Sequence, residues 1–550
     1  MIMVPIGLAI LTLAVYSPAL ENDFTNWDDP TYVSENPLVL GSFSSSLGQL
    51  LTTPVSLNYH PVTMFSLVAD RALYGSTPKG FHLTNVIFHV LNTVLVFVLA
   101  YLVGRKRLMI GALTAVIFGL HPMHVESVAW ISARKDVLYT FFFLGALVTY
   151  FRYLETRRSG WIWSTWGLFL LSVLSKAMAV VFPVVLLLVD FLMARKTNRK
   201  LFLEKLPFLA VSVIFGIVAF TIQSRGAIGN LGDFSVAQRL LFASYGCVMY
   251  VVKFFVPAGL AAFYPYPDTT NLPAVFYAAP LIMVALAALL FVSVRQTRVP
   301  IFAFGFYFVT VVLVLQFLSV GQAIMADRYT YLSYVGLGLG AAWGMAWLVD
   351  FLESRTFRFV LAGLVLLTAS AMAYVTQQRV QIWANSEVLW TDVIEKYPES
   401  AAEAYANRGS ALGSDGRVQE ALRDLEAAVR INDRDARYLD LLGVAYGSNR
   451  QFDEAFDAFA RGLERDPGRA EIYLNRAVIY SMMRDYARAA QDCRTAIDLN
   501  PNSGRAHFTM SRIYQSQNDL QQALSHAQQA QRLGFDVSPE YLNGLANPAP

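Results

Sequence analysis

Long apolar runs separated by short polar segments fill the first 376 residues of the chain. Most of the runs approach the roughly 20 residues that an α-helix needs to cross a hydrocarbon core of about 30 Å. We therefore predict an all-α, polytopic membrane bundle. Its eleven spanning helices are expected near residues 4–20, 81–103, 108–120, 136–151, 161–174, 177–194, 206–223, 274–294, 300–319, 330–350 and 358–376.

The basic residues of the short loops predict the orientation, because cytoplasmic loops carry an excess of Lys and Arg. All fifteen fall on one side if 236–256, which contains Arg239 and Lys253, forms an interfacial or re-entrant helix instead of a span. The N-terminus is then cytoplasmic and the C-terminal region lies outside. The first run has the alternative of a cleaved signal peptide, although no Lys or Arg precedes its apolar stretch. The fifteen are Arg105, Lys106, Arg107, Arg152, Arg157, Arg158, Arg195, Lys196, Arg199, Lys200, Lys205, Arg295, Arg298, Arg355 and Arg358.

After the last apolar run the pattern changes to a repeat of 34 residues. Small residues recur at two positions, where they let paired helices approach closely, and an aromatic residue recurs at a third. This spacing is typical of tetratricopeptide repeats, which stack into a solenoid with a concave protein-binding groove. A rigid spacer without a ligand is the alternative. The two sets of small residues are Gly409, Gly443, Ala477, Ser511 and Ala421, Ala455, Ala489, Ala523.

These patterns divide the chain into four parts. A transmembrane domain covers 1–376, a connector and half-repeat covers 377–401, four full repeats cover 402–535, and a tail covers 536–550. Composition agrees with this division, because about a quarter of the residues after 390 are charged but only about a tenth of those before. The whole chain is 55% hydrophobic with a net charge of +3, which argues against a soluble enzyme and against nucleic-acid binding. Cys247 and Cys493 are too few for a disulfide framework or a zinc site.

Ionisable residues gather at the predicted external ends of the apolar runs, where such groups are candidates for function. Asp28 and Asp29 follow the first run, and their adjacent carboxylates suit a general base or a metal, with a turn before Pro30 as the structural alternative. His121, His124 and Glu126 follow the third run. They suit a divalent metal, or hydrogen bonds at a helix end.

Basic residues at the same predicted side suit a phosphate. Arg328 begins the tenth run beside tyrosines and can grip a phosphate with two hydrogen bonds, or serve as an interfacial anchor. Lys176, Arg134 and Lys135 lie at other external helix starts, and His60 lies in the long loop 21–80. Carboxylates together with anion-binding cations at a membrane surface indicate transfer chemistry on a lipid phosphate. A transporter would share much of this pattern but would place ionisable groups in mid-helix.

Five short motifs, taken in order and followed by the repeats, resemble the transmembrane and tetratricopeptide repeat-containing proteins. More broadly the chain is similar to the C-type glycosyltransferases, which include the protein O-mannosyltransferases. The resemblance implies a polytopic membrane enzyme that uses a polyprenyl-phosphate sugar on the non-cytoplasmic face, with a catalytic acid in the first external loop. The matching positions here are Asp28 and Asp29. The motifs are WDD at 27–29, NYHPV at 58–62, FHLTN at 81–85, HPMHVESVA at 121–129 and DRYTYL at 327–332.

From this resemblance we expect sugar transfer, of mannose or another hexose, to a hydroxyl, with a protein Ser or Thr as the favoured acceptor and the repeats binding that protein. Asp28 or Asp29 is the expected base, with Glu126 as the next candidate. His60, His121, His124, Arg134, Lys135, Lys176 and Arg328 are expected to line the site or hold the phosphate. No metal is required in this scheme, although a divalent metal stays an open alternative. The animal members carry more repeats, and we favour a bacterial inner-membrane location with periplasmic repeats. The rival hypothesis is a non-catalytic membrane scaffold that recruits protein partners.

Overall fold

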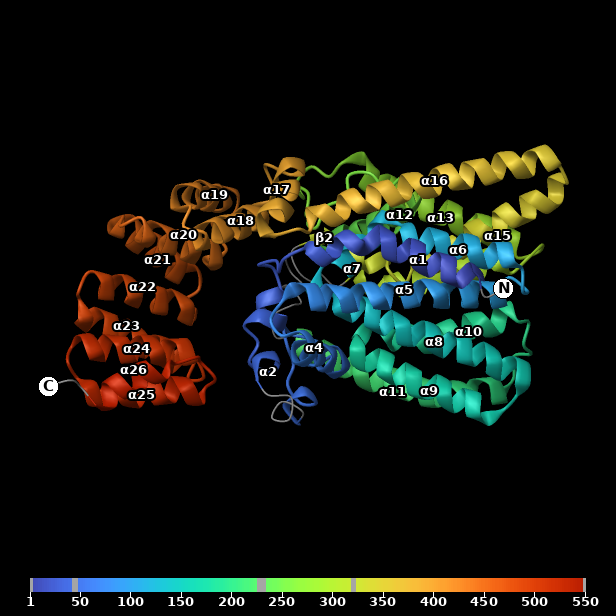
Figure 1. Cartoon of the computed structure of the whole chain (residues 1–550). Coiled ribbons are helices and arrows are strands. Elements are labelled where there is room, and N and C mark those ends of the chain that lie inside the picture. The colour runs from blue at the N-terminus through green and yellow to red at the C-terminus, as the bar shows by residue number, and fades with distance from the viewer. Residues whose placement is uncertain (1–2, 42–47, 225–233, 318–322, 548–550) are drawn as a thin grey trace. The chain divides into compact units, whose positions relative to one another are not determined.

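A computed structural model describes residues 3–41, 48–224, 234–317 and 323–547 of the chain, coloured by position in Figure 1. The chain forms two compact units, Met1–Lys396 and Tyr397–Pro550. Both are helical, and the described strands are two short segments in the first unit. The strands β1 (Tyr264–Pro265) and β2 (Ala323–Met325) pair antiparallel. The predicted all-α class is therefore confirmed.

The first unit is built from apolar helices that pack along one another. Each of the eleven predicted segments coincides with a helix, although residues 318–319 lie outside the described part. The helices are α1 (Met3–Tyr16), α2 (Pro37–Leu40), α4 (Pro61–Tyr74), α5 (Pro78–Val103), α6 (Leu108–Leu120), α7 (Val125–Ala129), α8 (Arg134–Thr156), α9 (Ser159–Ser175), α10 (Phe182–Leu192), α11 (Arg199–Gln223), α12 (Val236–Phe255), α13 (Ala274–Ser293), α14 (Val299–Val311), α15 (Tyr334–Leu352), α16 (Arg355–Ile382) and α17 (Ser386–Lys396).

Seven of the described helices are long and apolar enough to cross a membrane, which makes this chain a membrane protein. The helix α6 and the 122–129 segment are apolar and long enough only when taken together, and they are bent by 55° at the break between them, as in a broken span or a re-entrant loop. The shorter apolar helices Ala177–Leu192 and Val299–Val314 and the 17-residue α9 account for the remaining predicted segments. The excluded segment 236–256 forms α12, a continuous helix of 20 residues that is not among the seven.

A buried charge cluster joins α8, α10 and α11, and we call it the α8–α11 lock. It consists of Tyr150, Asp190, Arg195, Glu204 and Lys205. Arg195 lies 2.9 Å from the Asp190 carboxylate and 3.2 Å from that of Glu204, while Lys205 lies 2.9 Å and 2.6 Å from the same two groups. The Tyr150 hydroxyl donates to Asp190 at 2.6 Å and accepts from both cations. Every charge in the lock therefore has opposite charges beside it.

The second unit consists of helix pairs in the predicted register, so the tetratricopeptide prediction is confirmed. Gly409 shows why a small residue recurs there, since an added Cβ would lie 2.8 Å from Leu425 Cγ. Two of the pairs are also joined by an Arg–Asp contact, Arg408 with Asp424 and Arg476 with Asp492, both at 2.7 Å. The helices are α18 (Ala402–Ser414), α19 (Val418–Ile431), α20 (Ala436–Ser448), α21 (Phe452–Arg465), α22 (Ala470–Met482), α23 (Tyr486–Leu499), α24 (Gly504–Ser516), α25 (Leu520–Arg532) and α26 (Pro539–Ala546).

The predicted connector over 377–401 takes a definite form. The helix α16 continues to Ile382, and the short helix α17 follows it from Ser386 to Lys396. Both helices belong to the first unit, whose last residue is Lys396. The expected half-repeat is thus grouped with the membrane part, and the second unit begins at Tyr397.

Candidate active site

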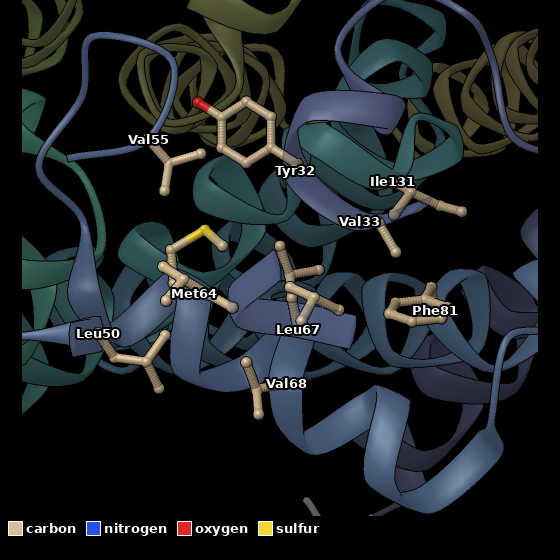
Figure 2. Close-up of a cluster of buried hydrophobic side chains, with 11 residues drawn as sticks. Tyr32, Val33, Leu50, Val55, Met64, Leu67, Val68, Phe81 and Ile131 are labelled. Atoms are coloured by element: carbon tan, nitrogen blue, oxygen red, sulfur yellow. The ribbon is translucent and has the colours of Figure 1, made fainter. Parts of the chain in front are cut away.

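The loop between α1 and α5 folds around a hydrophobic core of its own, shown in Figure 2. Met64, Leu67 and Val68 on one face of α4 pack into this core with Tyr32 and Val33, and Phe81 and Ile131 close it from the bundle. The apolar face of α4 therefore meets protein, although its amphipathic sequence also suits a membrane surface. This core fixes the chain on both sides of Asp28 and Asp29.

Asp29 is held by four hydrogen bonds. Its carboxylate accepts from the Thr25 amide at 2.8 Å and hydroxyl at 3.0 Å, and from the amide and hydroxyl of Ser132. The residue is 1% exposed, and this burial raises the pKa of the Asp29 carboxyl to about 6. Ser132 lies 103 positions further along the chain. Asp29 therefore ties the first loop to the segment that precedes α8.

Asp28 has a different environment. Its side chain is only half-buried, and among the described residues no hydrogen bond or ion pair reaches its carboxylate. The charge of Lys135 acts on it through space. The ammonium of Lys135 lies 4.5 Å above the Tyr32 ring and donates to the Tyr32 hydroxyl at 3.2 Å. Of the two adjacent carboxylates, Asp28 is the one that is available to an incoming group.

Arg328 lies in an aromatic box. Its guanidinium is 5.5 Å from the ring centroid of Trp27, 5.4 Å from that of Trp130 and 5.0 Å from that of Tyr329. It also forms an ion pair with Glu126, and the Arg328 backbone amide donates to the same carboxylate at 3.0 Å. Burial acts to lower the pKa of Arg328, but the charge and hydrogen bond of Glu126 together with the charges of Tyr329 and Asp136 outweigh it and hold the pKa above its usual value. The guanidinium is thus fixed in plane and position while its side chain stays 17% exposed.

Lys176 contributes a third cation. It follows α9, and its ammonium lies 2.5 Å from the carboxylate of Asp136, which is 1% exposed. Burial lowers the pKa of Lys176, and the Asp136 charge opposes that effect. The charges of Lys135 and Arg328 also reach Lys176. Asp136 therefore acts as a shared counter-ion at the first turn of α8.

The predicted histidines lie inside the protein. His121 Nε2 contacts the Phe254 carbonyl at 3.1 Å, and His124 Nδ1 contacts the Phe118 carbonyl at 2.8 Å, so both brace the turn between α6 and α7. His60 stacks on Tyr32, and burial lowers its pKa to about 3. Nowhere in the described ranges do three or more His, Cys, Asp or Glu side chains gather as a metal site would require.

Arg134 is a brace for the external loop. Its side chain is fully buried, with Asp70 at 2.6 Å, the Phe81 carbonyl at 2.8 Å and Asn85 in contact. It thereby joins α4, α5 and α8. Its neighbour Lys135 is the one that faces the Asp28 charge, so the two adjacent cations have different surroundings.

The structure thus brings together Asp28, Lys135, Lys176, Arg328 and Glu126 from four separate parts of the sequence. We call these five residues the charged site. Arg134, Asp29 and the histidines lie buried around it as supports. Sequence reasoning did not select Trp27, Trp130 or Asp136, although Trp27 adjoins Asp28 and Asp136 adjoins Lys135. For Trp27 and Asp136, the sign that the sequence offers is their position directly beside a candidate residue.

Comparisons with known proteins agree with this description. Tetratricopeptide repeat models match residues 402–435 and 470–503. A protein O-mannosyl-transferase of Caenorhabditis elegans is 29% identical over a match that covers 37% of this chain and 30% of that protein. The protein O-mannosyl-transferase TMTC2 of Mus musculus is 34% identical, with 29% of this chain and 20% of that protein covered. The resemblance predicted from the sequence is confirmed.

The matches cover only part of each chain. The matched region spans less than a third of the length of the curated relatives named above. However, 37% of 550 residues is about 204, which exceeds the 154 residues from Tyr397 to Pro550, so the C. elegans match includes part of the membrane unit. Among solved structures, MamA is 19% identical and covers 26% of this chain and 84% of that chain, with a TM-score of 0.24.

Proposed function

We propose that this protein is a membrane glycosyltransferase that moves a sugar from a polyprenyl-phosphate donor to a hydroxyl of a protein Ser or Thr. The observation that carries the proposal is the free carboxylate of Asp28 beside the cations of the charged site. A half-buried carboxylate that has no hydrogen bond or ion pair among the described residues, next to a lysine, is available to take a proton from a substrate. The names of the relatives, which are protein O-mannosyl-transferases, support the same reaction class.

In the proposed reaction Asp28 takes the proton of the acceptor hydroxyl. The acceptor oxygen attacks the anomeric carbon and forms the new glycosidic bond as the bond from that carbon to the phosphate oxygen breaks. The bonding pair leaves with the polyprenyl phosphate, and the anomeric configuration inverts. Phosphate is a good leaving group, so the protein's main tasks are to orient the acceptor and to stabilise the departing charge.

The cations of the charged site are placed to bind the donor phosphate and stabilise its charge as it departs. Arg328, held in its aromatic box, offers a planar guanidinium for two hydrogen bonds to phosphate oxygens. Lys135 and Lys176 supply further positive charge near the same place. Glu126 holds Arg328 in position in this scheme and is the next candidate for the base if Asp28 is not. Asp29 keeps the loop in place without touching the substrate.

The repeats are proposed to bind the acceptor protein, since stacked helix pairs of this kind present a surface for peptides. The sugar is a hexose, with mannose favoured by the names of the relatives. The side of the membrane follows from the positive-inside pattern, which predicts a cytoplasmic N-terminus and repeats in the periplasm or lumen. A bacterial inner membrane is the location we favour.

The deciding experiment compares the exported proteins of cells with and without the gene by mass spectrometry. Hexose-bearing Ser or Thr peptides should disappear with the gene, return with the wild-type copy, and stay absent with Asp28→Asn expressed at the same level. If the glycopeptides returned fully with Asp28→Asn, Asp28 would not be the general base, and Glu126 would become the candidate. Unchanged glycopeptides on deletion, with loss of binding partners instead, would favour the scaffold hypothesis.

The side of the membrane is tested separately with single cysteines. Both native cysteines are buried, so they give little background. A cysteine at Ser159 or Ser354 should resist an impermeant thiol reagent in intact cells, whereas one at Ser414 in the repeats should react. The reverse result would place the charged site on the cytoplasmic side and overturn the proposed donor face.

A further inference from the structure

The segment that precedes the repeats holds the loop that leads to Asp28. The Asn22 side chain donates to the Val380 carbonyl at 3.1 Å, and the Asp23 amide donates to the Ala384 carbonyl at 2.8 Å. These bonds join positions about 360 residues apart. The loop is therefore attached to the end of α16 at its beginning, a few residues before the charged site.

Two further bonds reach Asn26 from α17. The Asn26 amide donates to the Ser386 hydroxyl at 2.9 Å, and Trp390 Nε1 donates to the Asn26 side-chain carbonyl at 2.8 Å. Ser386 is the first residue of α17, and Trp390 lies one turn later on the same helix. Asn26, two residues before Asp28, is thus bonded to both residues of α17, to Ser386 through its main chain and to Trp390 through its side chain.

Tryptophan rings also pack between α17 and the loop that leads to Asp28. Trp27 stacks on Trp130 with centroids 4.7 Å apart, and the edge of Trp390 meets it at 5.1 Å. Trp383 stacks on the other ring, Trp130, at 5.7 Å. Trp383 and Trp390 are both almost completely buried. Because Trp27 also forms one side of the Arg328 box, the same rings lie between α17 and the cation.

We propose that Ser386 and Trp390 are positioning residues for the Asp28 carboxylate, an inference that rests on the proposed function. Within the described ranges no hydrogen bond or ion pair holds the Asp28 carboxylate, so its place depends on the main chain around it. Asp29 fixes that chain on one side through Thr25 and Ser132, and α17 fixes it on the other through Asn26 and Trp27. In this proposal α17 supports one side of the active site, and it also connects the membrane helices to the repeats.

Catalysis is sensitive to such placement, because a displacement of about 1 Å can cost on the order of a hundred-fold in rate. Donor binding should be less affected, since Arg328 is also held by Glu126 and Trp130, and Lys135 and Lys176 lie on other segments. Loss of the α17 bonds should therefore lower kcat and leave KM for the donor nearly unchanged. A contribution to folding alone would lower the amount of active protein but leave kcat per folded molecule intact.

The test uses the full-length protein in detergent or vesicles with a polyprenyl-phosphate hexose as donor. Trp390→Phe keeps most of the ring packing but removes the Nε1 donor, and Ser386→Ala removes the hydroxyl acceptor. Ser386→Thr keeps a hydroxyl and serves as the conservative rescue. Trp163→Phe is the matched control, because Trp163 is 70% exposed on α9. Amide hydrogen exchange of a peptide covering residues 22–28 reports the attachment without relying on activity.

We expect Ser386→Ala and Trp390→Phe each to speed exchange in 22–28 and to lower kcat by about ten-fold, with Ser386→Thr and Trp163→Phe close to wild type. Unchanged exchange in both variants would overturn the attachment, whatever the enzyme does. Faster exchange with unchanged kcat would overturn the positioning role. Inactivity of the wild-type protein with every hexose donor would instead overturn the proposed function, and the exchange data would still decide whether α17 holds the loop.

Discussion

The single helix α8 carries two buried charge clusters that differ in how completely they are paired. Near its end, Tyr150 belongs to the α8–α11 lock, in which two acids and two bases contact one another within 3.2 Å. At its first turn, Lys135 belongs to the charged site, where its partners are the Tyr32 hydroxyl and the more distant charges of Asp28 and Asp136. Both clusters contain buried charges, so burial alone does not distinguish them. They differ in Asp28, whose half-buried carboxylate has no hydrogen bond or ion pair in the part of the chain that the structure describes.

The largest expected effect concerns that carboxylate. Asp28→Asn keeps the size and hydrogen-bonding shape of the side chain but removes the base, so sugar transfer should fall by about 10²–10⁴-fold. Donor affinity and the melting temperature should stay close to wild type. Glu35→Gln, a comparable change at an exposed residue of the same loop, is the control. If the Asp28→Asn variant transferred sugar at the wild-type rate, the proposed difference in function between the charged site and the α8–α11 lock would be wrong.

The lock should respond in the opposite way. Asp190→Asn leaves Arg195 and Lys205 buried beside only one remaining acid, and breaking a buried ion pair costs about 3–5 kcal/mol. The melting temperature in detergent should therefore fall clearly, while kcat of the folded fraction stays unchanged. Asp350→Asn, which breaks an exposed pair with Arg107, should leave the melting temperature where it was. If Asp190→Asn instead reduced kcat without destabilising the protein, the lock would have to be regarded as functional.

Arg328 combines features of both clusters, since it is paired with Glu126 and partly exposed. An ammonium cannot fill the aromatic box or grip a phosphate with two bonds, so Arg328→Lys should weaken donor binding by roughly ten-fold. Arg298→Lys is the matched control, because Arg298 also stacks on a ring, that of Phe191, but lies outside the charged site. Equal donor affinity in wild type and Arg328→Lys would reduce Arg328 to an interfacial anchor.

The smallest expected effect is a pH dependence. Burial lowers the pKa of Lys176 below that of an ordinary lysine, so its positive charge is lost at a lower pH as the solution becomes alkaline. Donor binding should therefore weaken as pH rises through that lowered pKa. Lys176→Arg keeps its charge and should shift this decline to higher pH, whereas Lys79→Arg at an exposed site should not. An identical alkaline decline in all three proteins would exclude Lys176 as its source.

Much of the fold could be predicted because the membrane and the repeat impose strong periodic patterns. An apolar run such as 81–103 must satisfy its own backbone hydrogen bonds in a hydrocarbon layer, so it forms a helix. Helix pairs that recur every 34 residues stack on one another in a single known arrangement. The pairs Arg408–Asp424 and Arg476–Asp492 were not predicted. They are polar contacts between the two helices of a repeat, and a template of small and aromatic positions does not include them.

The candidate site could be predicted only as a set of residues. Adjacent residues such as Asp28 and Asp29, or Arg134 and Lys135, look alike in sequence, and their difference arises from partners at distant positions. Ser132 decides the environment of Asp29, and Asp70 decides that of Arg134. Likewise Trp390 lies in the connector and half-repeat predicted over 377–401, while its contacts with Asn26 and Trp27 depend on the tertiary fold. Local patterns contain none of these long-range contacts.

The bond from Asn22 to the Val380 carbonyl has a consequence for biosynthesis. Its two partners are separated by 358 positions, and a ribosome adds about 5–20 residues per second, so Asn22 waits roughly 20–70 s for Val380 to be made. During that time the segment before Asp28 lacks its attachment to α16 and α17. The nascent chain can therefore complete the attachments of this loop only after α16 and α17 have both been made, whereas the loop itself is among the first segments to be synthesised.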